Sequence, residues 1–144
     1  IAVLILVYGS VQTANALYLK KDLEHDAYLS LMTRVLYRVE AFEGYDPETT
    51  PLVIAGLPSH LEEVIPGFEI YRDPNGMYFS DVLTIQAQDR WQKYFDYVLM
   101  APVRLAEPGI WYPLLEDPRV AAMPAYPDAG CMAMIDGNLV VKVG

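Results

Sequence analysis

The sequence contains very little cysteine and histidine. Its 144 residues include one cysteine, Cys131, and two histidines. A single cysteine excludes an intrachain disulfide and a metal site built from several thiolates, and we interpret Cys131 as a buried core residue. His25 and His60 lie far apart and in neither of the short spacings that metal-binding motifs use. The sequence therefore predicts no metal site and no cofactor.

Positive charge is also scarce. Ten Lys and Arg residues stand against nineteen Asp and Glu residues, which gives a formal net charge of −9 at pH 7. Nucleic acids and anionic lipid head groups are bound through clusters of basic side chains. Lys20-Lys21 is the only adjacent basic pair in the chain. We therefore expect no nucleic-acid partner.

Signatures of soluble enzymes are missing as well. The segment from Ala55 to His60 lacks the glycine spacing of a dinucleotide-binding loop, and no Gly-x-Ser-x-Gly elbow of a serine hydrolase occurs. Neighbouring carboxylates, which glycoside hydrolysis requires, occur at Glu43 with Asp46, at Glu62-Glu63 and at Glu116-Asp117. With nineteen acids such pairs arise by chance, so we interpret all three as solvated surface.

Apolar side chains, in contrast, are abundant. They make up 53% of the residues, and eleven residues are Tyr, so a disordered chain is excluded. The sequence opens with eight apolar residues, from Ile1 to Tyr8, whereas a membrane span needs about 20. No basic stretch precedes them, as it would in a secretory signal. Two interpretations fit: a buried helix of a soluble protein, and the last turns of a transmembrane helix. The start at Ile rather than Met favours the second.

A long helix is predicted from about Ser10 to Phe42, a stretch without Pro or Gly. Its apolar residues recur at helical spacing. They are Leu23, Ala27, Leu31, Leu36, Val39 and Phe42, with Tyr28, Met32 and Val35 widening the stripe. At 1.5 Å per residue the helix is about 50 Å long, which suits a stalk rising from a membrane. Gly44 and Pro47 are placed to end it.

An α/β domain is predicted after this helix. The apolar run from Leu52 to Gly56 is typical of a strand buried on both faces, which implies helices on both sides of a sheet. Further expected elements are a short helix capped by Ser59 and Glu62, a strand at 68–71, a turn at 73–76 and a helix from Ser80 with an apolar face at Trp91, Tyr94, Phe95, Val98 and Leu99. Between Pro102 and Pro127 only short helices fit, such as Ile110 to Leu115.

The end of the chain predicts a β-hairpin. Residues 131–135 and 138–143 flank Asp136-Gly137, the sequence of a two-residue type I′ turn. Pairing across this turn places Met134 opposite Leu139 and Met132 opposite Val141. These side chains and Val143 then share one apolar face, while Asn138 and Lys142 point the other way.

These elements predict an α/β sandwich with a small mixed sheet, a long N-terminal helix and a C-terminal β-hairpin. Residues 1–43 are expected to form the end of a membrane span and the long helix that leads into the domain. Residues 44–144 are expected to form the soluble α/β domain, which packs with the helix as a single compact unit.

Two stretches of the chain carry a resemblance to a known family. The first joins 15–24, Asn-Ala-Leu-Tyr-Leu-Lys-Lys-Asp-Leu-Glu, to 39–51, which contains Gly44-Tyr45-Asp46-Pro47. The second joins Met-Pro-Ala-Tyr-Pro at 123–127 to Val140-Val141-Lys142 in 135–144. Together they resemble the C-terminal region of the GtrII-type glucosyltransferases, multi-pass bacterial membrane proteins. In that family a helix leaves the last span, reaches an acidic Gly-Tyr-Asp-Pro connection, and the chain closes on a Val-Val-Lys hairpin. The middle of the chain, about 57–122, carries no resemblance.

The resemblance implies transfer of a glucosyl or related hexosyl unit from a polyprenyl-phosphate donor to a cell-surface glycan. The domain would then lie on the outer side of the cytoplasmic membrane. Its implied partners are the membrane-spanning part of the same polypeptide, the polyprenyl-phosphate sugar and the acceptor glycan. Catalysis in the family is assigned to the membrane-spanning part, so no catalytic residue is carried over. Lys20-Lys21 opposes an outer location, because basic residues that flank a span favour the cytoplasmic side.

If the domain contacts a ligand, its connections are the expected place, because sites concentrate in loops. The candidate binding residues are Tyr45 and Asp46 in the acidic turn, and Tyr126 and Asp128 in the Tyr126-Pro127-Asp128 loop. The main alternative is a stand-alone protein-interaction module that docks through its apolar N-terminal helix. A third hypothesis is a small soluble enzyme that uses His60 and nearby acids.

Overall fold

The computed structural model of the chain describes residues 2–56 and 88–144. The expected helix at Ser59, strand at 68–71, turn at 73–76 and helix start at Ser80 lie outside the described residues, as does His60. In chain order the elements are α1 (Ala2–Glu40), β1 (Leu52–Ala55), α2 (Gln88–Tyr94), η3 (Phe95–Leu99), α3 (Pro108–Leu115), α4 (Pro118–Ala122), η4 (Ala129–Cys131), β2 (Met132–Ile135) and β3 (Asn138–Lys142). The predicted fold class, α/β with a small mixed sheet, a long N-terminal helix and a C-terminal hairpin, is confirmed.

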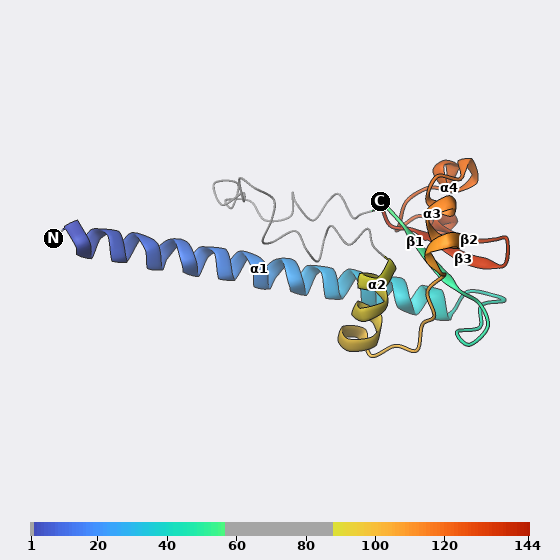
Figure 1. The fold of residues 1–144 in the computed structure, drawn as a ribbon, viewed down its shortest axis with the longest axis horizontal. Helices are drawn as coiled ribbons and strands as arrows, with labels where there is room; N and C mark the ends of the chain where they lie inside the picture. The colour runs from blue at the N-terminus through green and yellow to red at the C-terminus, as the bar shows by residue number, and fades with distance from the viewer. Residues whose placement is uncertain (1, 57–87) are drawn as a thin grey trace.

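Helix α1 is the longest element, with 39 residues, or about 58 Å at 1.5 Å per residue. Its N-terminal half projects away from the strands (Figure 1). The helix predicted from about Ser10 continues back to Ala2, through the apolar segment that both interpretations made helical, and Gly9 does not interrupt it. One glycine costs a helix only about 1 kcal/mol relative to alanine. The helix ends at Glu40, and Gly44 follows with a φ of +83°, a conformation that glycine adopts without strain.

The buried stripe of α1 lies in its C-terminal half. Tyr28, Met32, Val35 and Val39 are at most 1% exposed, and their spacing of four, three and four residues places them on one face. The predicted apolar stripe began too early, at Leu23. Its centre was also misplaced, because Tyr28, Met32 and Val35 were predicted only at its edge. Leu23 is 41% exposed, because it precedes the part of the helix that contacts the domain.

Three strands form the sheet, in the order β1-β3-β2. The hairpin register is as predicted, with Met134 opposite Leu139 and Met132 opposite Val141. Asp136 and Gly137 both have positive φ, 49° and 78°, as a type I′ turn requires. Strand β1 runs parallel to β3, with Leu52 beside Leu139, and all four of its residues are buried as expected.

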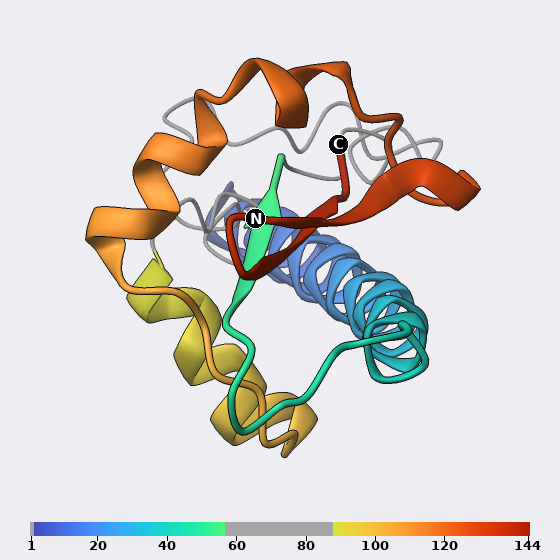
Figure 2. The same ribbon diagram turned by 90° about the vertical axis from the view of Figure 1, so that its right-hand side faces the viewer.

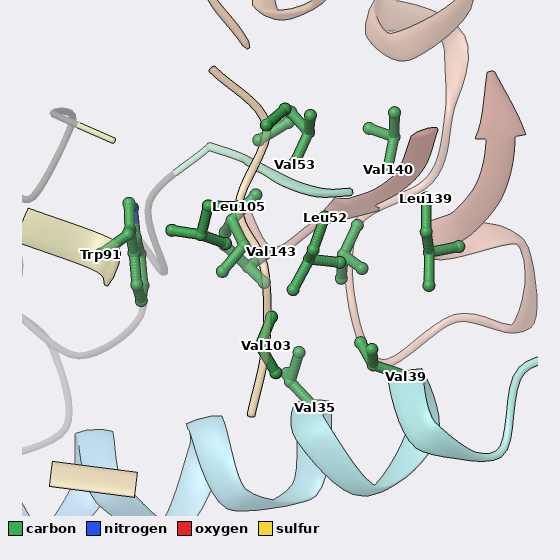
Figure 3. Close-up of a cluster of buried hydrophobic side chains, with 14 of the residues drawn as sticks. Val35, Val39, Leu52, Val53, Trp91, Val103, Leu105, Leu139, Val140 and Val143 are labelled. Atoms are coloured by element: carbon green, nitrogen blue, oxygen red, sulfur yellow. The ribbon is translucent and has the colours of Figure 1, made fainter. Parts of the chain in front are cut away.

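The sheet lies between α1 on one side and the arc of α3 and α4 on the other (Figure 2). Leu52 and Leu139 point toward Val35 and Val39 of α1, whereas Val53 and Val140 point to the opposite face (Figure 3). Each of these side chains is at most 1% exposed. The central strand β3 is therefore buried on both faces, as a strand between helical layers must be.

One side chain of the hairpin differs from the prediction. Met134, expected on the apolar face, is 42% exposed, because β2 is the edge strand and its outer part has no neighbouring strand. Asn138, expected on the face opposite Leu139, is only 5% exposed, because β3 is buried on both faces. Its side-chain amide donates to the backbone oxygen of Asp136 at 3.0 Å, which compensates for burial of the polar group.

An aromatic cluster joins α1 to α2 and η3. The ring of Tyr28 lies 5.9 Å from Trp91 and 5.3 Å from Tyr94, measured between ring centroids. Trp91, Tyr94 and Phe95 are buried as predicted, but Val98 is 41% exposed. The reason is local: the chain widens into a π-helical turn at Phe95–Leu99 and stops at Met100, whose φ is 52°.

Candidate functional site

The acidic turn after α1 positions Tyr45 and Asp46. The carboxylate of Asp46 accepts hydrogen bonds from the backbone N–H of Glu48 at 3.0 Å and from the hydroxyl of Thr49 at 2.7 Å. These bonds, that from Thr49 foremost, hold the pKa of Asp46 below its ordinary value, because they favour the charged carboxylate. The exposed Asp46 side chain thus already closes its own turn, and its remaining lone pairs face solvent.

Tyr45 is half-buried against the core. Burial, followed by the nearby carboxylates of Glu40 and Asp46, raises the pKa of its hydroxyl. The hydroxyl oxygen is buried and has no hydrogen-bond partner among residues 2–56 and 88–144. Tyr45 therefore presents no free hydroxyl to solvent, although its ring borders the exposed Asp46.

The side chain of one basic residue holds the second candidate loop, Tyr126-Pro127-Asp128, and that of another holds the segment before it. Nη1 of Arg38 donates to the backbone oxygen of Pro127 at 2.8 Å, and its guanidinium carbon lies 5.3 Å from the centre of the Tyr126 ring. Nζ of Lys142 donates to the backbone oxygens of Ala121 and Met123 at 2.8 Å each. These contacts hold the loop between α1 and β3.

Backbone hydrogen bonds complete the loop. The N–H of Tyr126 donates to the oxygen of Lys142 at 2.8 Å, and the N–H of Asp128 donates to Ala125 at 3.1 Å. The Tyr126–Pro127 peptide bond is cis. The Asp128 side chain is exposed and the Tyr126 ring is half-buried, so the loop presents an exposed carboxylate next to the pair formed by Arg38 and Tyr126.

The two candidate loops do not form one constellation. Within 2–56 and 88–144, no hydrogen bond or ion pair joins Tyr45 or Asp46 to Tyr126 or Asp128. Neither loop lies inside the core, so a binding role for the four residues stays a prediction. In the same ranges no group of three or more His, Cys, Asp and Glu side chains is placed to hold a metal ion.

Sequence reasoning missed the basic residues that fix this region. Arg38 and Pro127 are 89 positions apart, and no local pattern predicts such a contact. The guanidinium of Arg119 bridges Asp117 and Asp136, at 2.8 Å and 2.6 Å, and Asp117 also caps α4 by accepting from the N–H of Arg119. Asp117, interpreted as plain solvated surface, is thus half of a structural ion pair. The Asp-Pro-Arg sequence at 117–119 is a cap signal that could have indicated this role.

The most extensive exposed feature of the described chain is the N-terminal half of α1. Residues 2–19 have a mean hydropathy of 1.5, and none of this window is buried. By length and composition it is the one helix among 2–56 and 88–144 that could cross a membrane. Val3, Leu4, Ile5, Leu6 and Val7 are each more than half exposed. Successive helical residues lie about 100° apart, so these five cover the whole circumference of the helix.

Comparison of the chain with protein-family models, with curated proteins and with solved structures finds no match. The resemblance in the terminal segments therefore stays a prediction, and function is argued from the residues themselves.

Proposed function

We propose that this chain is the soluble C-terminal accessory domain of a multi-pass membrane hexosyltransferase, anchored by the first half of α1. The observation that carries the membrane part is that residues 2–19 are predominantly apolar and none of them is buried, in a helix whose other half is built into the core. Exposed apolar surface of this extent is unfavourable in water. In a bilayer the same surface is buried in hydrocarbon.

The distribution of these residues favours lipid over a protein groove. A groove covers one face of a docking helix and leaves the other polar. Here the first turns are apolar all round, which is typical of a helix surrounded by apolar material. This distinguishes the proposal from the main alternative, a stand-alone module that docks through the helix.

The glycosyl-transfer part of the proposal is supported by the GtrII-type resemblance of the terminal segments. In this hypothesis the domain covers the membrane-level active site or helps to hold the acceptor glycan, and the catalytic groups lie elsewhere in the polypeptide. The exposed Asp128 and the half-buried rings of Tyr45 and Tyr126 are the surfaces from which such contacts would be made.

Membrane insertion is tested by a matched pair of substitutions on α1. Val11→Asp places a charge near the centre of the apolar window, which costs about 3 kcal/mol in a bilayer. Tyr37→Asp changes another solvent-facing site, 73% exposed against 50% for Val11, outside the window. The segment 1–144 is expressed without any other span, so that only α1 can hold it in the membrane. We expect the wild-type segment and its Tyr37→Asp variant to resist carbonate extraction from membranes, and its Val11→Asp variant to be extracted. Complete extraction of the wild type would overturn the proposal.

Sidedness and activity need separate measurements. A membrane-impermeant thiol reagent should label Glu43→Cys in intact cells, since the resemblance implies an outer location. Labelling only after cell lysis would place the domain inside, as Lys20-Lys21 favours. For activity, membranes that contain the full-length protein should transfer labelled hexose from a polyprenyl-phosphate donor to glycan. Membranes without the protein are the control, and equal transfer in both would remove the hexosyltransferase part.

A further inference from the structure

The end of η3 carries three exposed apolar side chains. Tyr97 is 77%, Val98 41% and Met100 78% exposed. They stand out from the domain because the π-helical turn at Phe95–Leu99 ends at Met100, whose φ of 52° turns the chain away. We name Tyr97, Val98 and Met100 the η3 tip. Removal of such side chains from water is favourable, so the η3 tip is a surface suited to an apolar contact.

The charged groups beside the η3 tip are compatible with a phospholipid surface. Asp96 is the one acid of η3, and its carboxylate accepts a hydrogen bond from the side-chain amide of Gln92 at 2.9 Å. The same amide donates to the backbone oxygen of Val103 at 2.9 Å, so the carboxylate is held on the side of α2 that faces Val103. Lys93 lies one turn before Tyr97 and is exposed. Lysine stems lie along apolar surroundings while their ammonium groups extend to polar ones, such as lipid phosphates.

The η3 tip belongs to the part of the domain that lies nearest to the exposed half of α1. Tyr28, the first core residue of α1, contacts the rings of Trp91 and Tyr94, which directly precede η3. Among the described elements that follow α1, α2 and η3 lie closest to its N-terminal half (Figure 1). The β2–β3 hairpin lies toward the other end of the helix. A membrane crossed by the N-terminal half of α1 therefore faces η3 before the other described elements of the domain.

The height of η3 above the hydrocarbon follows from the charges on α1. Lys20, Lys21 and Asp22 follow Leu19 directly, so they close the apolar stretch whatever precedes it. Tyr28 lies about 14 Å beyond Leu19 along the axis, and the head-group layer extends about 5 to 8 Å beyond the hydrocarbon. Membrane-spanning helices tilt by about 20° on average. A tilt of α1 toward η3 lowers the η3 tip toward the head groups, whereas a tilt the other way raises it.

We infer that the η3 tip is a second membrane contact of this chain, which inserts among phospholipid head groups and sets the direction in which α1 tilts. This inference rests on the proposed function. Tyrosine rings favour the membrane–water interface, and the flexible side chain of Met100 adapts to irregular surroundings. Because α1 holds the domain at the bilayer, the contact is made within one anchored molecule. A free protein partner or a second copy is the poorer occupant, because it must also offset the loss of its own translational freedom.

Fluorescence quenching by lipid tests this contact. The 144-residue chain is reconstituted in phosphatidylcholine vesicles, with Cys131→Ala and one environment-sensitive fluorophore attached through Tyr97→Cys or Met100→Cys. The controls carry the fluorophore through Tyr37→Cys or Tyr112→Cys, at sites that are 73% and 48% exposed. Tyr37 lies about 27 Å beyond Leu19 along the helix axis. We expect lipids with a nitroxide on the head group to quench the fluorescence at 97 and 100 and to leave that at 37 and 112 unchanged.

A matched pair of substitutions separates insertion from mere proximity. In the chain labelled at 100, Tyr97→Asp should abolish the quenching, because a carboxylate opposes insertion, whereas Tyr37→Asp should not. Quenching that survives Tyr97→Asp, or that is equal at all four labelled sites, overturns the inference. A fluorophore at 97 or 100 that shifts to the blue without being quenched by lipid overturns it in favour of a protein cover.

Carbonate extraction of every variant distinguishes failure of this inference from failure of the proposed function. A chain that resists extraction but shows no quenching at 97 and 100 overturns the inference and leaves the membrane proposal standing. A wild-type chain that is extracted overturns both.

Discussion

The guanidinium of Arg38 lies over the ring of Tyr126, 5.3 Å from its centre, and donates to the backbone oxygen of the next residue, Pro127. One side chain on the last turns of α1 thus holds two consecutive residues of a distant loop. The thiol of Cys131 is near the same guanidinium, but burial dominates and raises the pKa of the thiol. Contact with α1 thus adds to the backbone hydrogen bonds that tie the loop to Lys142 and, through Asp128 and Ala125, to itself.

Removal of this contact should loosen the loop. We expect Arg38→Ala to lower the free energy of unfolding by about 1 to 2 kcal/mol, because it deletes a cation–π contact and a hydrogen bond from a charged donor. Hydrogen exchange at the Tyr126 amide should speed up. The control is Arg34→Ala, since among the described residues the Arg34 side chain donates only to Ser30 of its own helix. Equal effects of the two substitutions would contradict a specific role for Arg38.

The central strand should be far more sensitive to truncation than the edge strand. Leu139 and Met134 are cross-strand neighbours, yet Leu139 is 0% and Met134 42% exposed. We expect Leu139→Ala to cost about 2 to 5 kcal/mol of folding free energy. Met134→Ala should cost about 1 kcal/mol or less, as is usual at partly exposed sites. Urea unfolding in detergent measures both, and a larger loss for Met134→Ala would refute the assigned layering.

Gly56 and Gly44 form a second matched pair. Both have a φ of +83°, but a Cβ at Gly56 would overlap the backbone of Gly144, whereas one at Gly44 would meet nothing. Gly44→Ala should cost about 1 to 2 kcal/mol for the left-handed backbone alone. Gly56→Ala should cost more, since β1 or the end of β3 must also move. Thermal unfolding of both variants decides this, and equal losses would show that the close approach is unimportant.

Acid should weaken the ion pairs around Arg119. Its guanidinium holds the pKa of both Asp117 and Asp136 below the ordinary 3.8. Carboxylates with a depressed folded pKa stabilise the fold fully above the unfolded value, and this stabilisation is lost as pH falls through the lower folded value. We expect Arg119→Ala to flatten the fall in stability below about pH 4. Arg104→Ala, at another exposed arginine, should leave this pH dependence unchanged.

Local patterns in the sequence predicted those parts of the fold that depend on neighbouring residues. The Asp136-Gly137 turn requires positive φ at both positions, so the hairpin and its register followed directly. The apolar run at Leu52 likewise predicted a strand buried on both faces, because every side chain in the run is apolar. The parallel pairing of β1 with β3 and the Arg38–Pro127 contact join segments far apart in sequence, and no spacing rule predicts which distant groups meet.

The candidate site was predictable only as a pair of loops. Tyr45, Asp46, Tyr126 and Asp128 were chosen because they lie in connections, and the structure shows what else these residues do. Asp46 closes its own turn and Tyr126 supports Arg38. Sequence alone cannot distinguish a polar residue that stabilises a loop from one that binds a ligand, because both kinds of residue occur in the same turns.

The continuity of α1 has a mechanical consequence. No loop separates Leu19 from the first core residue, Tyr28, so the helix is a rigid connection between its exposed N-terminal half and the sheet. One residue inserted there would turn the sheet by about 100° and advance it by about 1.5 Å along the axis. A flexible linker would absorb such a change, whereas here every insertion or deletion would point the Tyr126 loop in a new direction.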